Sequence, residues 1–428
     1  MLRSSTSKQT GEIEGAVSFG AFTLLLVLKP LADMFWSVRL LDYALLAFAL
    51  MLLVFRLPRS TVKFGMPDVC AVLITSLILF SGLRSTEGFS VCIKMISPFI
   101  LYFLGRIYWS ELIKGRRYLL YALALTVLLN TMEMLLGKGF QIWGSARTFS
   151  GFYFFKTDLA CAMGLAFISW LFLGDGKRSR ALICSLAVLL VVLSNTRAYY
   201  IVLMVDLLLY AAMKADLRIS IRTVFISALG IIAALYFLNW LFSTGIFSDL
   251  NFIDFSFTNL SDLFDSSNTQ GRNVIWETLL YRIDNASSFE RLFGIDLVSD
   301  LVVVNGSAYG SHSLYMGMLY NTGICGLSLL FMFMIAVLNC LRKIQDKRFS
   351  YFAVAIGAQF LISGLSVHVL QYTGNSWIPF AVVGAMFSYS QLYKNFEPKM
   401  PMLSEAEYEG CNAEGRSECS TEHLRRKA

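Results

Sequence analysis

Apolar runs of about 17 to 23 residues recur from one end of this 428-residue sequence to the other. Each run is long enough to cross a hydrocarbon core about 30 Å thick as an α-helix. The composition agrees, because 56% of the residues are hydrophobic and only 15% are charged, whereas a soluble chain needs more polar surface. The runs therefore predict an all-α, polytopic helical membrane protein. The first run has no small-residue cleavage site, so it is not expected to be a removed signal peptide.

About twelve transmembrane helices are expected, with one large loop between the ninth and the tenth. The predicted spans are Gly15–Trp36, Leu40–Phe55, Pro67–Leu83, Phe89–Trp109, Arg117–Gly137, Thr157–Gly174, Ala181–Ser194, Arg197–Met213, Arg222–Phe242, His312–Leu341, Phe349–Leu370 and Trp377–Tyr393.

Basic residues are concentrated in alternate connections, as in Arg56/Arg59/Lys63 and Arg342/Lys343/Lys347/Arg348. By the positive-inside rule, both termini are cytoplasmic and the large loop is extracytoplasmic. The sequence thus divides into a cytoplasmic N-terminus (1–14), spans one to nine (15–242), the large loop (243–311), spans ten to twelve (312–393) and a disordered cytoplasmic tail (394–428).

The large loop carries three arginines against nine acidic residues, and it holds no cysteine that could form a disulfide. Its second half, from Gly271 to Ile283, predicts an amphipathic helix with Trp276, Leu279, Leu280 and Ile283 on one apolar stripe. Polar segments of this size are rare in polytopic membrane proteins, so the loop and the span entrance behind it are interpreted as the working part.

Two of the three histidines lie at predicted outer ends of spans, where an imidazole can act as a base or donate to an anion. His312 opens the tenth span and His368 closes the eleventh. A histidine bonded to a carbonyl at the interface is the alternative, but the place of His312 directly behind the loop favours a functional role. Arg197 ends the tight turn Ser194-Asn195-Thr196-Arg197 and is interpreted equally well as an anion contact or as an arginine that extends to the interface.

Further guanidinium groups on the outer side suit bidentate binding of phosphate or diphosphate. They belong to Arg147, Arg272, Arg282 and Arg291, of which the last two are expected on a solvated helix face. Charges inside spans are expected to be functional or paired, and these are Lys29, Lys94, Glu133 and Asp206. For Asp206, a buried partner is favoured over a role in ion transport.

Several classes of function are disfavoured. The sequence has no Walker motif, dinucleotide-binding glycine pattern, HExxH or serine-nucleophile elbow, so nothing couples ATP to work. The net charge of +7 comes mainly from short loops without interleaved aromatics, so nucleic acid is not an expected partner. No cofactor and no metal are expected, because the spacing of Cys411, Cys419 and His423 matches no common zinc site.

Four short motifs share the predicted outer side between Arg147 and Leu341. Gly271-Arg-Asn-Val-Ile-Trp276 has the form Gly-Arg-x-x-x-Trp, Ser194-Asn-Thr-Arg197 is similar to Ser-x-Ser-Arg, and Arg147-Thr-Phe-Ser-Gly151 is similar to Arg-x-x-Gly. Ser311-His-Ser-Leu-Tyr315, followed by Gly323-Ile-Cys-Gly-Leu327, is similar to His-Asn-x-Tyr/Phe-Leu … Gly-Ile/Leu-x-Gly, with Ser313 in place of Asn. In this order, and with the large loop, the motifs resemble the bacterial O-antigen polymerase and O-antigen ligase superfamily of lipid-linked-glycan enzymes.

The resemblance implies a metal-independent, inverting glycosyltransferase that moves a glycan from a polyprenyl diphosphate carrier to an acceptor hydroxyl on the outer face of the membrane. It implies that Arg197 and Arg272 bind the diphosphate, with Arg147 as a further candidate, and that His312 is the base or orients the acceptor. A chain-length regulator and a flippase are partners expected only through the resemblance. If these roles hold, Arg197, Arg272 and His312 should converge at one outer site.

Within this chemistry, we favour a polymerase of a surface polysaccharide (O-antigen, capsule or exopolysaccharide). The nearest alternative is a ligase that passes the finished glycan to lipid A–core or another acceptor, since the acceptor pocket is what differs. From another class, a twelve-span transporter or a lipid-linked oligosaccharide flippase predicts charges around a midplane cavity. A non-catalytic scaffold remains the last alternative, and activity retained after changes at Arg197, Arg272 and His312 would favour it.

Overall fold

The computed structural model describes residues 20–59, 62–84, 88–143, 146–217, 272–297, 302–304 and 307–395. Within these ranges the chain is mostly helical, and each predicted span that they contain lies over a helix. The predicted ninth span (222–242), the first half of the large loop and the tail lie outside the described residues.

The helices before the large loop are α2 (Ala21–Met34), α3 (Arg39–Arg56), the short 3-10 helix η1 (Leu57–Arg59), α4 (Met66–Leu83), α5 (Phe89–Ile107), α6 (Trp109–Leu135), α7 (Lys156–Leu173), α8 (Lys177–Ser194) and α9 (Arg197–Lys214). Those within and after it are α12 (Arg272–Asp284), α13 (Ser288–Phe293), α14 (Leu314–Leu341), α15 (Lys347–Ser363) and α16 (Thr373–Asn395).

Five helices in the described part of the chain are long and apolar enough to cross a membrane, namely α4, α5, α6, α7 and α14. Large apolar side chains are also exposed along helix faces, with Phe55 70%, Leu135 76% and Ile335 59% exposed. Contiguous apolar surface of this kind is costly in water and normal against lipid. The protein is therefore embedded in a membrane.

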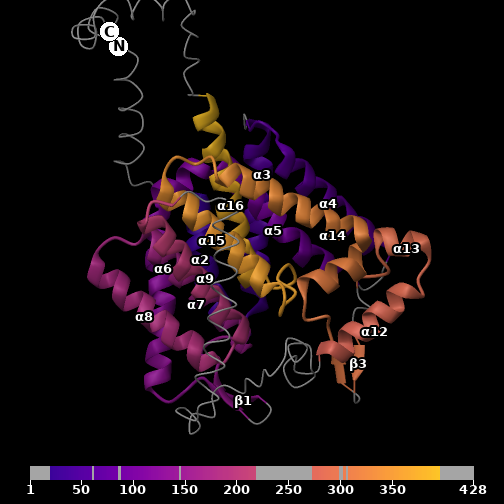
Figure 1. Cartoon of the computed structure of the whole chain (residues 1–428), viewed down its shortest axis with the longest axis horizontal. Coiled ribbons are helices and arrows are strands. Elements are labelled where there is room, and N and C mark those ends of the chain that lie inside the picture. The colour runs from indigo at the N-terminus through magenta and orange to yellow at the C-terminus, as the bar shows by residue number, and fades with distance from the viewer. Residues whose placement is uncertain are drawn as a thin grey trace, which may run out of the picture.

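Helices α7, α15 and α16 consist mostly of buried residues. Helices α5, α15 and α16 lie near the middle of the bundle (Figure 1). The backbones of α5 and α16 touch, because a Cβ added at Gly105 would lie 2.0 Å from the carbonyl oxygen of Ala381. Any side chain larger than hydrogen at Gly105 would push the two central helices apart.

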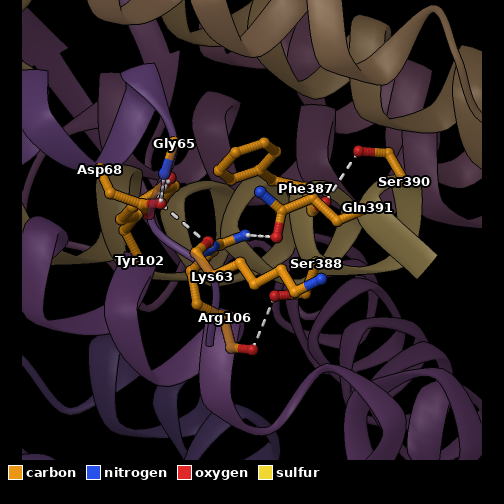
Figure 2. Close-up of polar contacts among 9 residues, drawn as sticks. All are labelled: Lys63, Gly65, Asp68, Tyr102, Arg106, Phe387, Ser388, Ser390 and Gln391. Carbon is orange, nitrogen blue, oxygen red and sulfur yellow. Dashed lines mark hydrogen bonds and ion pairs between the residues drawn. The ribbon is translucent and has the colours of Figure 1, made fainter. Parts of the chain in front are cut away.

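A buried ion pair joins α4, α5 and α16 (Figure 2). The Arg106 Nη2 atom lies 3.0 Å from Asp68 Oδ2, and both side chains are almost fully buried. Further groups contact the pair. The Tyr102 hydroxyl and the Gly65 amide donate to Asp68. Arg106 donates to the Lys63 carbonyl and the Gln391 amide oxygen, and its guanidinium lies over the Phe387 ring. Since a buried charge is tolerated when it is paired, this cluster fastens three helices together.

Helix α14 is broken at Gly323, whose φ of 68° and ψ of −170° are not helical. The break frees the carbonyl of Tyr320, which accepts a hydrogen bond of 2.8 Å from the amide of Ile295. A Cβ at Gly323 would lie 2.3 Å from the carbonyl of Leu292 at the end of α13. Only glycine combines this φ with so close an approach, so Gly323 is where α13 docks against α14.

Two small β-hairpins accompany the helices of this mostly helical fold. Strand β1 (Phe140–Trp143) pairs antiparallel with β2 (Ala146–Phe149), and β3 (Val302–Val304) pairs with β4 (Ser307–Tyr309). Both hairpins lie in connections between helices. In Figure 1, β1 and β3 lie toward the same end of the molecule.

Two predicted boundaries were wrong. Helix α15 ends at Ser363 rather than Leu370, because the apolar residues Val367 to Leu370 form a buried turn instead of continuing the helix. Helix α6 begins at Trp109 rather than Arg117, so the basic residues Lys114, Arg116 and Arg117 lie on its first turns. A helix can continue past the apolar section of a span into charged residues at the membrane surface. A hydropathy pattern detects only the apolar section, so it misses this extension.

Candidate functional site

The backbone around His312 is fixed by its two neighbouring serines. The Ser311 hydroxyl donates to the carbonyl of Ser313, and the Ser313 hydroxyl donates to the carbonyl of Gly364. The Ser313 side chain also accepts from the amide of Met316, which makes it the N-cap of α14. The residue in place of the asparagine of the resembled motif thus has a capping role that asparagine also performs well.

His312 itself has a left-handed backbone, with φ of 46°. This conformation is uncommon outside glycine and is maintained here by the hydrogen bonds on either side. The His312 side chain is partly exposed, whereas Ser311 and Ser313 are buried. The imidazole is therefore presented from a rigid turn.

Helix α12 is attached to this turn through Trp276, whose indole N–H donates to the carbonyl of Ser311 at 2.9 Å. The buried stripe of α12 consists of Ile275, Leu279 and Ile283, which pack with Val302 and Tyr320. The predicted stripe was therefore partly wrong: Leu280 is 44% exposed, and Trp276 lies beside the stripe at its border with the His312 turn. Figure 1 shows α12 and α13 beside α14.

Three cationic side chains stand at the first position of a helix in this region. Arg272 begins α12, Arg197 begins α9 and Lys156 begins α7. The turn before Arg197 is made by Asn195 in the left-handed conformation, with φ of 50°. Their charges act on one another, since Lys156 experiences the charges of both Arg272 and Arg197. We call Lys156, Arg197, Arg272 and His312 the cationic cluster.

Burial and the neighbouring charges shift the titration of this cluster. Burial, and then the charge of Arg197, lowers the pKa of Arg272. Burial, and then the charge of Arg272, lowers the pKa of His312 from its usual 6.5. At neutral pH the imidazole is therefore neutral and can accept a proton. Among the described residues, every charge that acts on Arg272, His312 and Lys156 in this way is positive. An anion would relieve that repulsion.

The sequence-predicted site residues are thus placed in two groups. Arg197, Arg272 and His312 form the first group: the charge of Arg197 acts on Arg272 and that of Arg272 acts on His312, and the Trp276–Ser311 hydrogen bond joins α12 to the His312 turn. Arg147 is on β2, where its exposed guanidinium stacks 4.6 Å from the centre of the Phe140 ring. Arg147 is not among the charges that act on His312 or Arg272.

Other candidates have structural partners. The Arg291 guanidinium donates to the carbonyls of Ala286 and Asp284, so it ties α13 to the end of α12 rather than facing only solvent. His368 is buried, and within the described residues its ring nitrogens have no hydrogen-bond partner. A Cβ added at Gly317 would lie 2.2 Å from its Nε2 atom, which places His368 beneath the first turn of α14.

The charges predicted inside spans differ from one another. Lys29 is fully buried and paired with Asp33 and Asp42, whereas Lys94 is exposed. The expected partner of Asp206 is not found: its carboxylate is fully buried, and neither oxygen has a hydrogen-bond partner in the part of the chain that the structure describes.

Sequence reasoning missed Lys156 as a member of the site. Lys156 belongs to none of the four motifs. Its proximity to Arg197 and Arg272 depends on how α7, α9 and α12 pack. Within the described residues, no group of three or more histidine, cysteine or acidic side chains is arranged to hold a metal ion.

The fold and site define a helical membrane-embedded protein with a half-buried cationic cluster at one end of the bundle. Comparison with protein-family models gives no match to this chain, and a search of curated proteins finds no similar sequence.

Proposed function

We propose that the protein is a membrane glycosyltransferase that uses a polyprenyl-diphosphate-linked glycan as donor and polymerises a surface polysaccharide. The observation that carries the proposal is that the helix beginning at Arg272 is hydrogen-bonded to the His312 turn, while the charge of Arg272 acts on His312 and that of Arg197 acts on Arg272. The motif resemblance described above supports the same chemistry. The proposal includes twelve spans, cytoplasmic termini and a cationic cluster on the outer face of a bacterial inner membrane.

The chemistry needs little beyond this cluster. The acceptor hydroxyl oxygen attacks the anomeric carbon of the donor sugar, the bond from that carbon to the diphosphate breaks, and the hydroxyl proton passes to the neutral imidazole of His312. The polyprenyl diphosphate leaves with the bonding electrons, and its growing negative charge is stabilised by Arg197 and Arg272, with Lys156 beside them. Because the leaving group is already good, no nucleotide is required.

A surface-glycan profile tests the proposal. A strain lacking the gene is complemented with wild type, His312→Ala or Arg272→Ala, and lipid A–core and carrier-linked glycans are separated on gels. Loss of long chains, with single repeat units left on the carrier or cap, is the result expected of a polymerase. Arg282→Ala, on the same helix as Arg272 but near its other end, is the matched control and should keep the wild-type profile.

Two other outcomes would change the assignment. Long chains that accumulate on the polyprenyl carrier would identify a ligase rather than a polymerase. A normal profile in both variants, at normal protein level, would contradict the active-site assignment.

A further inference from the structure

A second polar cluster lies beside the cationic cluster and has no part in the proposed reaction. Asp33 near the end of α2 and Asp158 in the first turn of α7 are close enough for the charge of Asp33 to act on Asp158. The Asn375 side chain donates to Asp158 at 3.4 Å, and Gly374 lies against the Asp33 carboxylate. We call Asp33, Asp158 and Asn375, together with Tyr153, the carboxyl cluster.

Ion pairing explains only part of this arrangement. Lys29 donates to Asp33 and, at 2.8 Å, to Asp42, so one buried ammonium group is shared between two carboxylates. Asp158 brings a third carboxyl group within range of the same lysine. Lys29 hydrogen-bonds to Asp33 and Asp42 and not to Asp158, so ion pairing with this lysine does not account for the place of Asp158.

Tyr153 provides an independent observation. It is only 4% exposed, and its hydroxyl has no hydrogen-bond partner in the part of the chain that the structure describes. The charges of Asp33 and Asp158 both act on this hydroxyl, which places it in the neighbourhood of the carboxyl cluster. A buried hydroxyl without a partner is costly and is usually satisfied by a bound molecule.

Aromatic rings border the same cluster. The ring centroids of Trp36 and Phe154 lie 4.5 Å apart, and these side chains are 48% and 45% exposed. Phe154 contacts Phe155, whose ring faces Tyr372 next to the start of α16. Carboxylates and amides that bind hydroxyl groups, together with exposed aromatic rings that contact C–H faces, are the combination that recognises carbohydrate.

The two clusters meet on a single helical turn. Lys156 and Asp158 are both in the first turn of α7, and Lys156 experiences the charges of Arg197 and Arg272 while Asp158 experiences that of Asp33. A ligand with an anionic group on one side and hydroxyl groups on the other would match both. A sugar linked to a diphosphate has this character.

We propose that Asp33, Asp158 and Tyr153 form a carbohydrate subsite that binds the hydroxyl groups of a substrate sugar beside the diphosphate. This inference rests on the proposed function and adds to it the place where the sugar is held. Asp33 and Asp158 accept hydrogen bonds from sugar hydroxyls, and the Tyr153 hydroxyl gains the partner that it lacks. A metal-ion site fits less well, because Lys29 already occupies two carboxylates and no metal-holding group occurs among the described residues.

The test separates sugar binding from diphosphate binding in the full-length protein in lipid nanodiscs. Saturation-transfer NMR with a panel of methyl glycosides (hexoses, N-acetylhexosamines and uronic acids) measures sugar binding. Titration with inorganic pyrophosphate measures diphosphate binding. For Tyr153→Phe we expect affinity for the bound glycosides to fall about tenfold, as for the loss of one hydrogen bond. Its melting temperature should be unchanged, because the hydroxyl has no partner in the free protein. Asp158→Asn should weaken glycoside binding at least as much, and neither change should affect pyrophosphate.

Tyr121→Phe, which removes the hydroxyl of an exposed tyrosine on α6, is the matched control and should behave as wild type. The subsite is wrong if no glycoside in the panel binds the wild type, or if Tyr153→Phe and Asp158→Asn both leave binding intact. Loss of Mg²⁺ binding in Asp158→Asn without any glycoside binding would overturn it in favour of a cation site. A separate result would contradict the proposed function itself: the affinity for pyrophosphate would be the same in Arg272→Gln as in the wild type.

Discussion

The indole N–H of Trp276 donates a 2.9 Å hydrogen bond to the carbonyl of Ser311, the residue directly before His312. This single contact joins the helix that begins with Arg272 to the turn that presents the imidazole. The relative position of α12 and the His312 turn is therefore set by a contact between an indole ring and the backbone.

Trp276→Phe should separate positioning from packing. The change keeps an aromatic ring but removes the donor, and we expect about 1 kcal/mol less stability together with a disproportionate loss of glycan product. Thermal melting and gel profiles of the complemented strain measure the two effects. The control is Trp170→Phe, because the Trp170 indole also donates at 2.9 Å, to the Leu120 carbonyl, away from the cationic cluster. Equal loss of product in both variants would show that Trp276 has no positioning role.

The titration of His312 is a second prediction. Burial and Arg272 both disfavour the imidazolium, so the pKa of folded His312 lies below 6.5. The stability that this adds is present above pH 6.5 and is lost as the pH falls from 6.5 through the folded pKa. Arg272→Gln removes a positive charge and should raise the pKa of His312.

Histidine NMR can check this directly, because the chain has three histidines. Burial lowers the pKa of His368 to about 4, so its signal should titrate separately from that of His312. Assignment by His312→Gln completes the measurement. An unchanged His312 titration in Arg272→Gln would contradict the proximity of the two groups.

Gly323→Ala should destabilise the protein by about 2 kcal/mol or more. The new Cβ would meet the Leu292 carbonyl at 2.3 Å, and φ is 68°. Gly357→Ala is the matched control, because there the added Cβ meets only the end of Met334 at 3.9 Å. In a helix interior that exchange should be neutral or stabilise by up to about 1 kcal/mol. Chemical denaturation in mild detergent measures both, and similar effects would contradict the docking of α13 at Gly323.

Asp68→Asn should strongly reduce the amount of folded protein, since it leaves the buried Arg106 charge without its counterion at a cost of about 3 to 5 kcal/mol. The activity of each surviving molecule should be preserved, because the pair holds helices together and takes no part in the proposed chemistry. Asp175→Asn makes the same exchange in an exposed pair with Arg117 and should change stability by less than about 1 kcal/mol. Fluorescence-detected size-exclusion chromatography compares the two. Comparable yields would mean that the buried pair is dispensable.

The sequence predicts the helices well because the length and apolarity of a span are local properties. It fails where apolar residues serve another purpose, as in Val367 to Leu370, whose hydrophobicity reflects burial in a turn rather than passage through lipid. It also fails for the β1–β2 hairpin, where two four-residue strands provide too few alternations to identify.

The site shows the same division. Arg197, Arg272 and His312 follow from short motifs, because each depends on a local turn or helix start. No short motif contains the other residues, which are Lys156, Asp158, Asp33 and Tyr153. Their neighbourhood depends on how distant segments such as α2, α7 and α16 pack together. The spacing of Lys29 and Asp33, four residues apart in an apolar run, is a local feature of the sequence that could have indicated this cluster.

The break at Gly323 gives α14 a hinge-like joint between the segment behind His312 and the segment that is long enough to lie in lipid. Helices adapt to bilayers of different thickness by tilting. In an unbroken helix such a tilt would carry His312 with it. Here the segment before Gly323 packs against α12 and α13 instead, so we expect a tilt of the later segment to bend α14 at Gly323 and to leave the imidazole in place beside Arg272.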